Sequence, residues 1–204
     1  MPAQHLEILV EEPSMEAFLQ TLMPRLLPDD RTFLIHPFQG KSDLLSKLRD
    51  RLAGYSKWLP PEWRIVVVLD RDDDDCVELK KQLEVTAAAS HLHSKASGHT
   101  PWRVVNRIAI EELEAWYFGS WSAVLTAYPR VPKTIPAKAA YRDPDAIAGG
   151  TWEAFERILA RAGYFKAGLP KVDTARTLGA LVDRASSSSA SFRQFCAAID
   201  DAIS

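Results

Sequence analysis

The chain alternates short apolar runs with amphipathic stretches from its start to about residue 128. Four runs have the length and composition of strands, and they occupy residues 6–10, 32–38, 64–69 and 102–109. The stretch after each run repeats its apolar residues at helical spacing, which predicts helices over 14–26, 42–55, 76–93 and 111–128. This alternation predicts an α/β fold, Rossmann-like, with a mostly parallel sheet of four or more strands and helices on its faces.

The pattern changes at Pro129, where four prolines interrupt the chain within sixteen residues. Helical periodicity then returns near 151–162, 171–185 and 190–203. We therefore expect an α/β core over residues 1–128 and a helical C-terminal extension over 129–204 that packs on the core.

Composition limits the classes of protein to consider. The 204 residues are 47% hydrophobic and 25% charged, with a net charge of -2, as in an ordinary globular protein. A strong excess of basic residues would have indicated a protein that binds nucleic acid. Its absence does not exclude that class, because an enzyme that handles phosphates through a metal can carry its positive charge on the ion. The two cysteines are far apart, which fits a reducing compartment. The sequence shows no signal peptide and no apolar run long enough to span a membrane, so we expect a cytoplasmic protein that does not associate with a membrane.

The strongest chemical signal is the acidic run that follows the strand at 64–69. Asp70 and Asp72 are two residues apart, so on an extension of that strand both carboxylates would point to one place. Magnesium prefers hard oxygen ligands of this kind. The alternative is a solvated turn that also caps the next helix, which suits Asp74 or Asp75.

Glu11 ends the first strand and gives the second signal. In parallel sheets ligands bind beyond the carboxyl ends of the strands, and both Glu11 and Asp70 fall there. Alternatively, Glu11 interacts only with the dipole of the helix that follows it.

These two segments resemble known motifs. Val10–Ser14 is similar to the opening strand-to-helix motif of Toprim domains, and Leu69–Asp72 resembles their DxD motif. Over nearly its full length the chain resembles an uncharacterised bacterial family of Toprim-like proteins, related to overcoming-lysogenisation-defect nucleases. The segments that carry this resemblance are Phe38–Lys41, Leu69–Cys76, Ile108–Trp116, Tyr164–Lys166 and Ser191–Phe192.

The resemblance implies a nuclease that uses Mg²⁺, or Mn²⁺, to cleave phosphodiester bonds. Asp70 and Asp72 would ligate magnesium, and Glu11 would ligate a second ion or act as general base. Glu114 is preferred over Glu111 as a further acid, from the end of the fourth strand. The resemblance also implies nucleic acid as a partner, a bacterial defence or mobile-element setting, and a partner ATPase. The sequence leaves the oligomeric state open, with a homodimer as one alternative.

The basic residues of the extension offer contacts for a substrate. Lys166 and Lys171 are candidates for binding phosphate, although most lysines are simply exposed.

Two other classes of function compete with the nuclease. A DxD motif after a strand also serves nucleotide-sugar transferases, which would not need Glu11. Dehalogenase-type phosphatases want a threonine where Asp74 stands. A non-catalytic subunit that regulates a partner ATPase is the third reading, and Glu12, in a place where Toprim domains commonly have glycine, favours it.

Three weaker signals do not change this picture. Gly40-Lys41-Ser42 lacks the earlier glycine of a phosphate-binding loop. The histidines at 91, 93 and 99 suggest zinc but have no cysteine pair or HExxH beside them. Cys76 follows an acidic run, which would raise a thiol pKa and disfavour a nucleophile.

Overall fold

A four-stranded parallel sheet forms the centre of the protein. The computed structural model describes residues 1–204 and orders the strands β2-β1-β3-β4. Their bounds are His5–Val10 for β1, Thr32–Pro37 for β2, Trp63–Asp70 for β3 and Val104–Ala109 for β4. The expected α/β class with a parallel sheet is confirmed.

The strand order reverses between β1 and β3. The chain goes from β1 outward to β2, then crosses back to place β3 on the other side of β1. In open α/β sheets this switch point leaves a crevice at the carboxyl ends of the two central strands. Glu11 follows β1 and Asp70 ends β3, so the fold puts both acids at the crevice.

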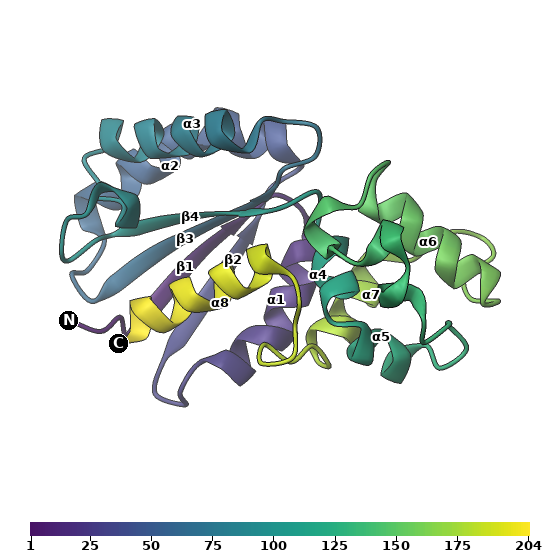
Figure 1. The fold of residues 1–204 in the computed structure, drawn as a ribbon. Helices are drawn as coiled ribbons and strands as arrows, with labels where there is room; N and C mark the ends of the chain where they lie inside the picture. Colours follow the sequence, from purple (N-terminus) through teal and green to yellow (C-terminus); the bar gives the residue numbers. More distant parts are fainter.

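Helices cover both faces of the sheet. The helices α2 (Lys41–Trp58) and α3 (Cys76–Ala89) lie on one face, and α1 (Pro13–Leu26) and α8 (Ala190–Ile203) lie on the other (Figure 1). β3 is buried on both faces, which explains its unbroken run of β-branched residues.

A helical lobe stands beyond the carboxyl ends of the strands (Figure 1). It contains α4 (Glu114–Gly119), α5 (Trp121–Ala127), α6 (Thr151–Arg161) and α7 (Lys171–Gly179), joined by 3-10 turns at Ile135–Ala137, Ala139–Tyr141 and Pro144–Ala146. One hydrophobic core of 42 buried residues runs from the α1 and α8 face of the sheet into this lobe. The chain then returns to the sheet through α8, where the Ala3 amide donates to the Ala202 carbonyl at 2.7 Å.

Several predicted boundaries were wrong. The single helix expected over 111–128 is two short helices that break at Ser120. The sequence pattern did not reveal this break, because apolar residues occur on every side of the segment. The helix expected to reach residue 93 ends at Ala89, and the one expected to reach 185 ends at Gly179. No helix in the structure has the length and apolar character needed to cross a membrane.

Gly179 allows α7 to pack closely against α1. A Cβ atom there would lie 2.3 Å from the Phe18 carbonyl oxygen and 2.3 Å from the Thr21 hydroxyl. We expect Gly179→Ala to lower the free energy of unfolding by about 1–3 kcal/mol through overpacking, measured by chemical denaturation. Gly54→Ala is the matched control, because Gly54 has open space around it inside α2. That change should raise stability by up to about 1 kcal/mol, and equal effects of the two substitutions would contradict the packing argument.

Candidate functional site

Glu11 and Asp70 lie side by side at the carboxyl edge of the two central strands. The Asp70 amide donates to the Glu11 carboxylate at 3.1 Å. The turn after β1 is held by the Gly40 amide, which donates to the Glu11 carbonyl at 2.9 Å. Two acids that are 59 residues apart in the chain are therefore fixed in contact by neighbouring strands.

Asp70 is a buried carboxylate without a full set of partners. The residue is 7% exposed, and its Oδ1 atom is buried with no hydrogen-bond partner. Burial, and then the charges of Glu11 and Glu114, hold the Asp70 pKa well above its usual range. Burial also raises the pKa of Glu11 to about 6, although the Asp70 amide lowers it in part. Such a pair favours either a proton or a cation between the carboxylates.

Glu114 adds a second buried carboxyl, with Asp70 and the half-buried Glu11, to the same edge. It lies in the first turn of α4. Burial, and secondarily the charge of Glu112, raises its pKa to about 8, while Lys171 opposes the shift. The Glu114 charge also raises the pKa of Asp70, so the two groups are close enough to interact.

Tyr117 belongs to this environment and was missed in the sequence. Its hydroxyl is buried without a hydrogen-bond partner, and burial followed by the charges of Glu114 and Asp70 raises its pKa. It stands in a segment rich in aromatics, most of which are core, so nothing in the local pattern distinguished it.

Asp72 does not continue the strand, and that expectation was wrong. β3 ends at Asp70, and Asp72 adopts a left-handed conformation with φ of 49°. Its amide donates to the Glu111 carbonyl at 2.8 Å, which turns the chain away. The Asp72 charge still raises the pKa values of Glu11 and Asp70. Its assignment as a metal ligand stays a prediction.

Lys41 holds the acidic loop in place. Its ammonium group lies 2.7 Å from Asp72 and 2.8 Å from Asp74, and it donates to the Arg71 carbonyl at 2.8 Å. Burial lowers its pKa, but the hydrogen bonds to the two aspartates outweigh burial and the net shift is upward. Lys41 thus supplies a fixed positive charge beside the carboxylates, a role that its place in a turn did not predict.

The neighbouring glutamates have structural partners. Glu111 forms an ion pair with Arg71. Glu112 accepts hydrogen bonds from the Thr151 hydroxyl at 2.9 Å and the Trp152 amide at 2.7 Å, and so caps α6. Glu114 forms no ion pair, and its role as the candidate acid stays a prediction.

The two candidate lysines differ in position. The Lys171 ammonium lies 4.2 Å from the centre of the Trp152 ring, and its charge acts on Glu114. Lys166 is exposed and pairs with none of these carboxylates. Lys171 is therefore the one that borders the site.

Asp75 is the helix cap of the acidic run. Its carboxylate accepts from the Val77 amide at 2.8 Å and the Glu78 amide at 2.9 Å. Asp75→Ala should reduce stability by about 1 kcal/mol, measured by thermal unfolding. Asp73→Ala is the control, since Asp73 is exposed and makes no such bonds. A loss of stability as large in Asp73→Ala would contradict the capping role.

The donors suit a magnesium ion that keeps water ligands. No three histidine, cysteine, aspartate or glutamate side chains stand as a ready cage for a metal ion. Magnesium, however, commonly takes only one or two carboxylates, with water and substrate phosphate as its other ligands. The Glu11 and Asp70 carboxylates are close enough for the Glu11 charge to raise the Asp70 pKa, and the unpartnered Asp70 Oδ1 provides a free acceptor.

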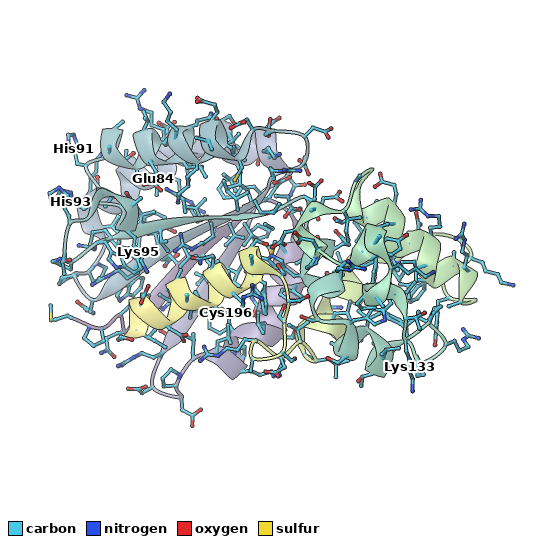
Figure 2. All side chains as sticks on the ribbon, in the orientation of Figure 1. Glu84, His91, His93, Lys95, Lys133 and Cys196 are labelled. Carbon is cyan, nitrogen blue, oxygen red and sulfur yellow. The ribbon has the colours of Figure 1, made fainter.

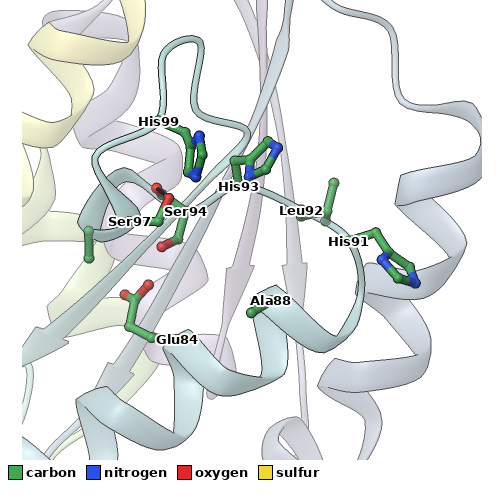
Figure 3. Close-up of a pocket in the computed structure, with 9 residues that line it drawn as sticks. Glu84, Ala88, His91, Leu92, His93, Ser94, Ser97 and His99 are labelled. Carbon is green, nitrogen blue, oxygen red and sulfur yellow. Dashed lines mark hydrogen bonds between the residues drawn. The ribbon is translucent and has the colours of Figure 1, made fainter.

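The three histidines line a different cavity of about 540 Å³ near the end of α3. The rings of His93 and His99 stack with centres 4.2 Å apart, while His91 points elsewhere and Glu84 lies on the helix below (Figure 3). Glu84 is bound to Lys80 at 2.8 Å and to Asn106 at 2.9 Å. These groups do not form a zinc site as they stand.

Comparison with known proteins gives a family but no activity. Residues 10–200 match the family described as Domain of unknown function (DUF4276). No curated protein and no solved structure matches the chain.

Proposed function

Because the chain belongs to the DUF4276 family, a family without a known function, we propose a function from the site itself: a Mg²⁺- or Mn²⁺-dependent nuclease of the Toprim type that hydrolyses phosphodiester bonds in nucleic acid. The contact between Glu11 and the buried Asp70 at the strand switch point carries this proposal. Adjacent carboxylates of this kind are stabilised by a divalent cation.

The residues divide the chemistry between them. When bound, a divalent ion would activate water and neutralise phosphate charge. Glu11 and Asp70 would hold it, with Asp72 as a further ligand. Burial raises the pKa of Glu114 to about 8 in the metal-free protein, so Glu114 is the group that would donate a proton to the leaving oxygen of the cleaved P–O bond. Lys41 and Lys171 supply positive charge at the rim.

The Toprim resemblance supports the same function and indicates a biological context for it. It favours a bacterial cytoplasmic enzyme in defence or on a mobile element, with nucleic acid as substrate and an ATPase as partner. The contact between Glu11 and Asp70 also favours a nuclease over a nucleotide-sugar transferase, which would have no need of Glu11.

A non-catalytic regulatory subunit is the second candidate. The ion pair between Asp72 and Lys41 supports it, because it withdraws one acid of the DxD motif from the cluster. Such a subunit would bind a divalent ion and a partner ATPase but cleave nothing.

Cleavage of labelled DNA and RNA with Mg²⁺ or Mn²⁺ tests the proposal. We expect cleavage by the wild-type protein, none in EDTA, and none by Glu11→Gln. Loss of cleavage in EDTA together with full activity of Glu11→Gln would point to a metal enzyme of another type. Metal binding without cleavage, alone or with an added ATPase, would favour the regulatory subunit.

A further inference from the structure

Positive charge is concentrated in the helical lobe. Residues 130–171 contain eight lysines and arginines but only four acids, while the whole chain has 25 basic and 27 acidic residues. The eight are Arg130, Lys133, Lys138, Arg142, Arg157, Arg161, Lys166 and Lys171. None of them takes part in an ion pair of the structure. This lobe therefore presents unneutralised cations to solvent.

We call Arg130, Arg157, Arg161 and Lys166 the basic tip, because Arg157 and Arg161 are one turn apart in the last half of α6, Lys166 follows the helix by five residues and Arg130 contacts Gly163 just beyond it. The Arg130 guanidinium lies 4.1 Å from the centre of the Tyr164 ring and donates to the Gly163 carbonyl at 3.1 Å. Gly163 is two residues beyond Arg161, the last residue of α6. All four cationic residues are exposed.

No acid forms an ion pair with the basic tip, although Glu153 and Glu156 lie close to Arg157 along α6. Glu156 is half-buried and accepts a hydrogen bond from the Leu169 amide at 3.1 Å. Figure 2 shows a further cation of the lobe, Lys133, at the end of the molecule opposite His91 and His93.

α6 connects the carboxylate site to the basic tip. Its first residues, Thr151 and Trp152, donate to Glu112 beside the site. The helix then runs outward for 11 residues, about 16 Å at the rise of an α-helix. At about 3.4 Å per base pair, this length corresponds to four or five base pairs of duplex.

The carboxylate edge itself repels a polyanion. Negative charge lies at this edge, where the charges of Glu11 and Asp72 act on Asp70. The chain as a whole has a net charge of -2. Affinity for a nucleic acid comes mainly from cations that displace counterions from phosphates, and Lys41, the cation beside these acids, is already paired with Asp72 and Asp74.

We propose that the basic tip is the phosphate-binding surface of this protein, holding the backbone of a nucleic acid within about five base pairs of the bond cleaved at the carboxylates. This inference rests on the proposed nuclease function. It assigns binding to the lobe and chemistry to the sheet edge.

Fluorescence anisotropy in EDTA tests the surface without cleavage. The probes are a labelled DNA duplex and a labelled RNA of equal length, titrated over a range of salt concentrations. The variant is Arg157→Gln with Arg161→Gln, since Arg130 also has a structural contact. Arg49→Gln with Lys57→Gln is the matched control, because both residues are exposed and unpaired on α2.

We expect the α6 variant to bind duplex at least about 10-fold more weakly near physiological salt. The slope of log K against log salt should fall in size by about 1.8 for two lost phosphate contacts. The control should bind as the wild type does, and the stronger of the two probes identifies the nucleic acid.

Unchanged affinity and slope in the α6 variant, with binding retained, would overturn the basic tip while leaving the nuclease proposal intact. No binding of either probe by the wild type at low salt would overturn both. Binding to vesicles of anionic lipid but to neither nucleic acid would assign the cations to a membrane surface instead.

Discussion

Replacing Asp70 by asparagine should strongly reduce cleavage and at the same time make the metal-free protein more stable above neutral pH. Asparagine keeps the shape of the side chain but removes a carboxylate that is buried, has an unpartnered oxygen and is close to Glu11 and Glu114. Losing one of two metal-binding carboxylates should reduce the cleavage rate by about 100-fold or more. Thermal unfolding in EDTA at pH 8 should show a higher Tm than the wild type.

The opposite directions of the two effects make this result informative. Substituting a residue that only supports the fold would lower the activity and the stability of the protein together. Asp73→Asn is the control, because Asp73 is exposed in the same acidic run, and it should change neither property. A lower Tm in Asp70→Asn, or cleavage at the wild-type rate, would contradict the role assigned to Asp70.

The metal-free protein should lose stability as the pH rises from about 4.5 to about 8. The pKa of Glu114 is about 8 in the folded protein, against 4.5 as its ordinary value. The folded state therefore holds a proton that the unfolded state has released across this window, and the free energy of unfolding falls as pH rises. Asp70 acts in the same direction. At about 1.4 kcal/mol per pKa unit, the effect of Glu114 is on the order of a few kcal/mol.

Glu114→Gln should flatten this dependence, because glutamine does not titrate. Urea denaturation at several pH values in EDTA measures the slope for both proteins. Glu153→Gln, an exposed glutamate of α6, is the control. A wild-type stability that rises through the same window, or an unchanged slope in Glu114→Gln, would contradict the burial of a protonated carboxyl here.

Much of the fold could be predicted because the local pattern and the tertiary environment agree. The sequence of β3 is dominated by one apolar run, and the strand is buried along nearly its whole length. A parallel sheet places all carboxyl ends at one edge, so Glu11 and Asp70 could be expected near each other before their contact was known.

Other features depend on contacts that no local pattern reveals. The turn at Asp72 requires the Glu111 carbonyl, 39 residues away, and the position of its carboxylate requires Lys41. Glu112 caps α6, because the chain folds back at Thr151. In each case a polar group is satisfied by a partner distant in sequence, which periodicity does not encode.

Metal binding at Glu11 and Asp70 is tested most directly by calorimetric titration of Mn²⁺ into the wild-type protein, Glu11→Gln and Asp70→Asn, since this needs neither substrate nor a partner protein. Saturable binding by the wild type that is lost or strongly weakened in both variants is the result we predict. Equal binding by all three proteins, or none by the wild type, would contradict the assignment of the carboxyl edge as a divalent-metal site.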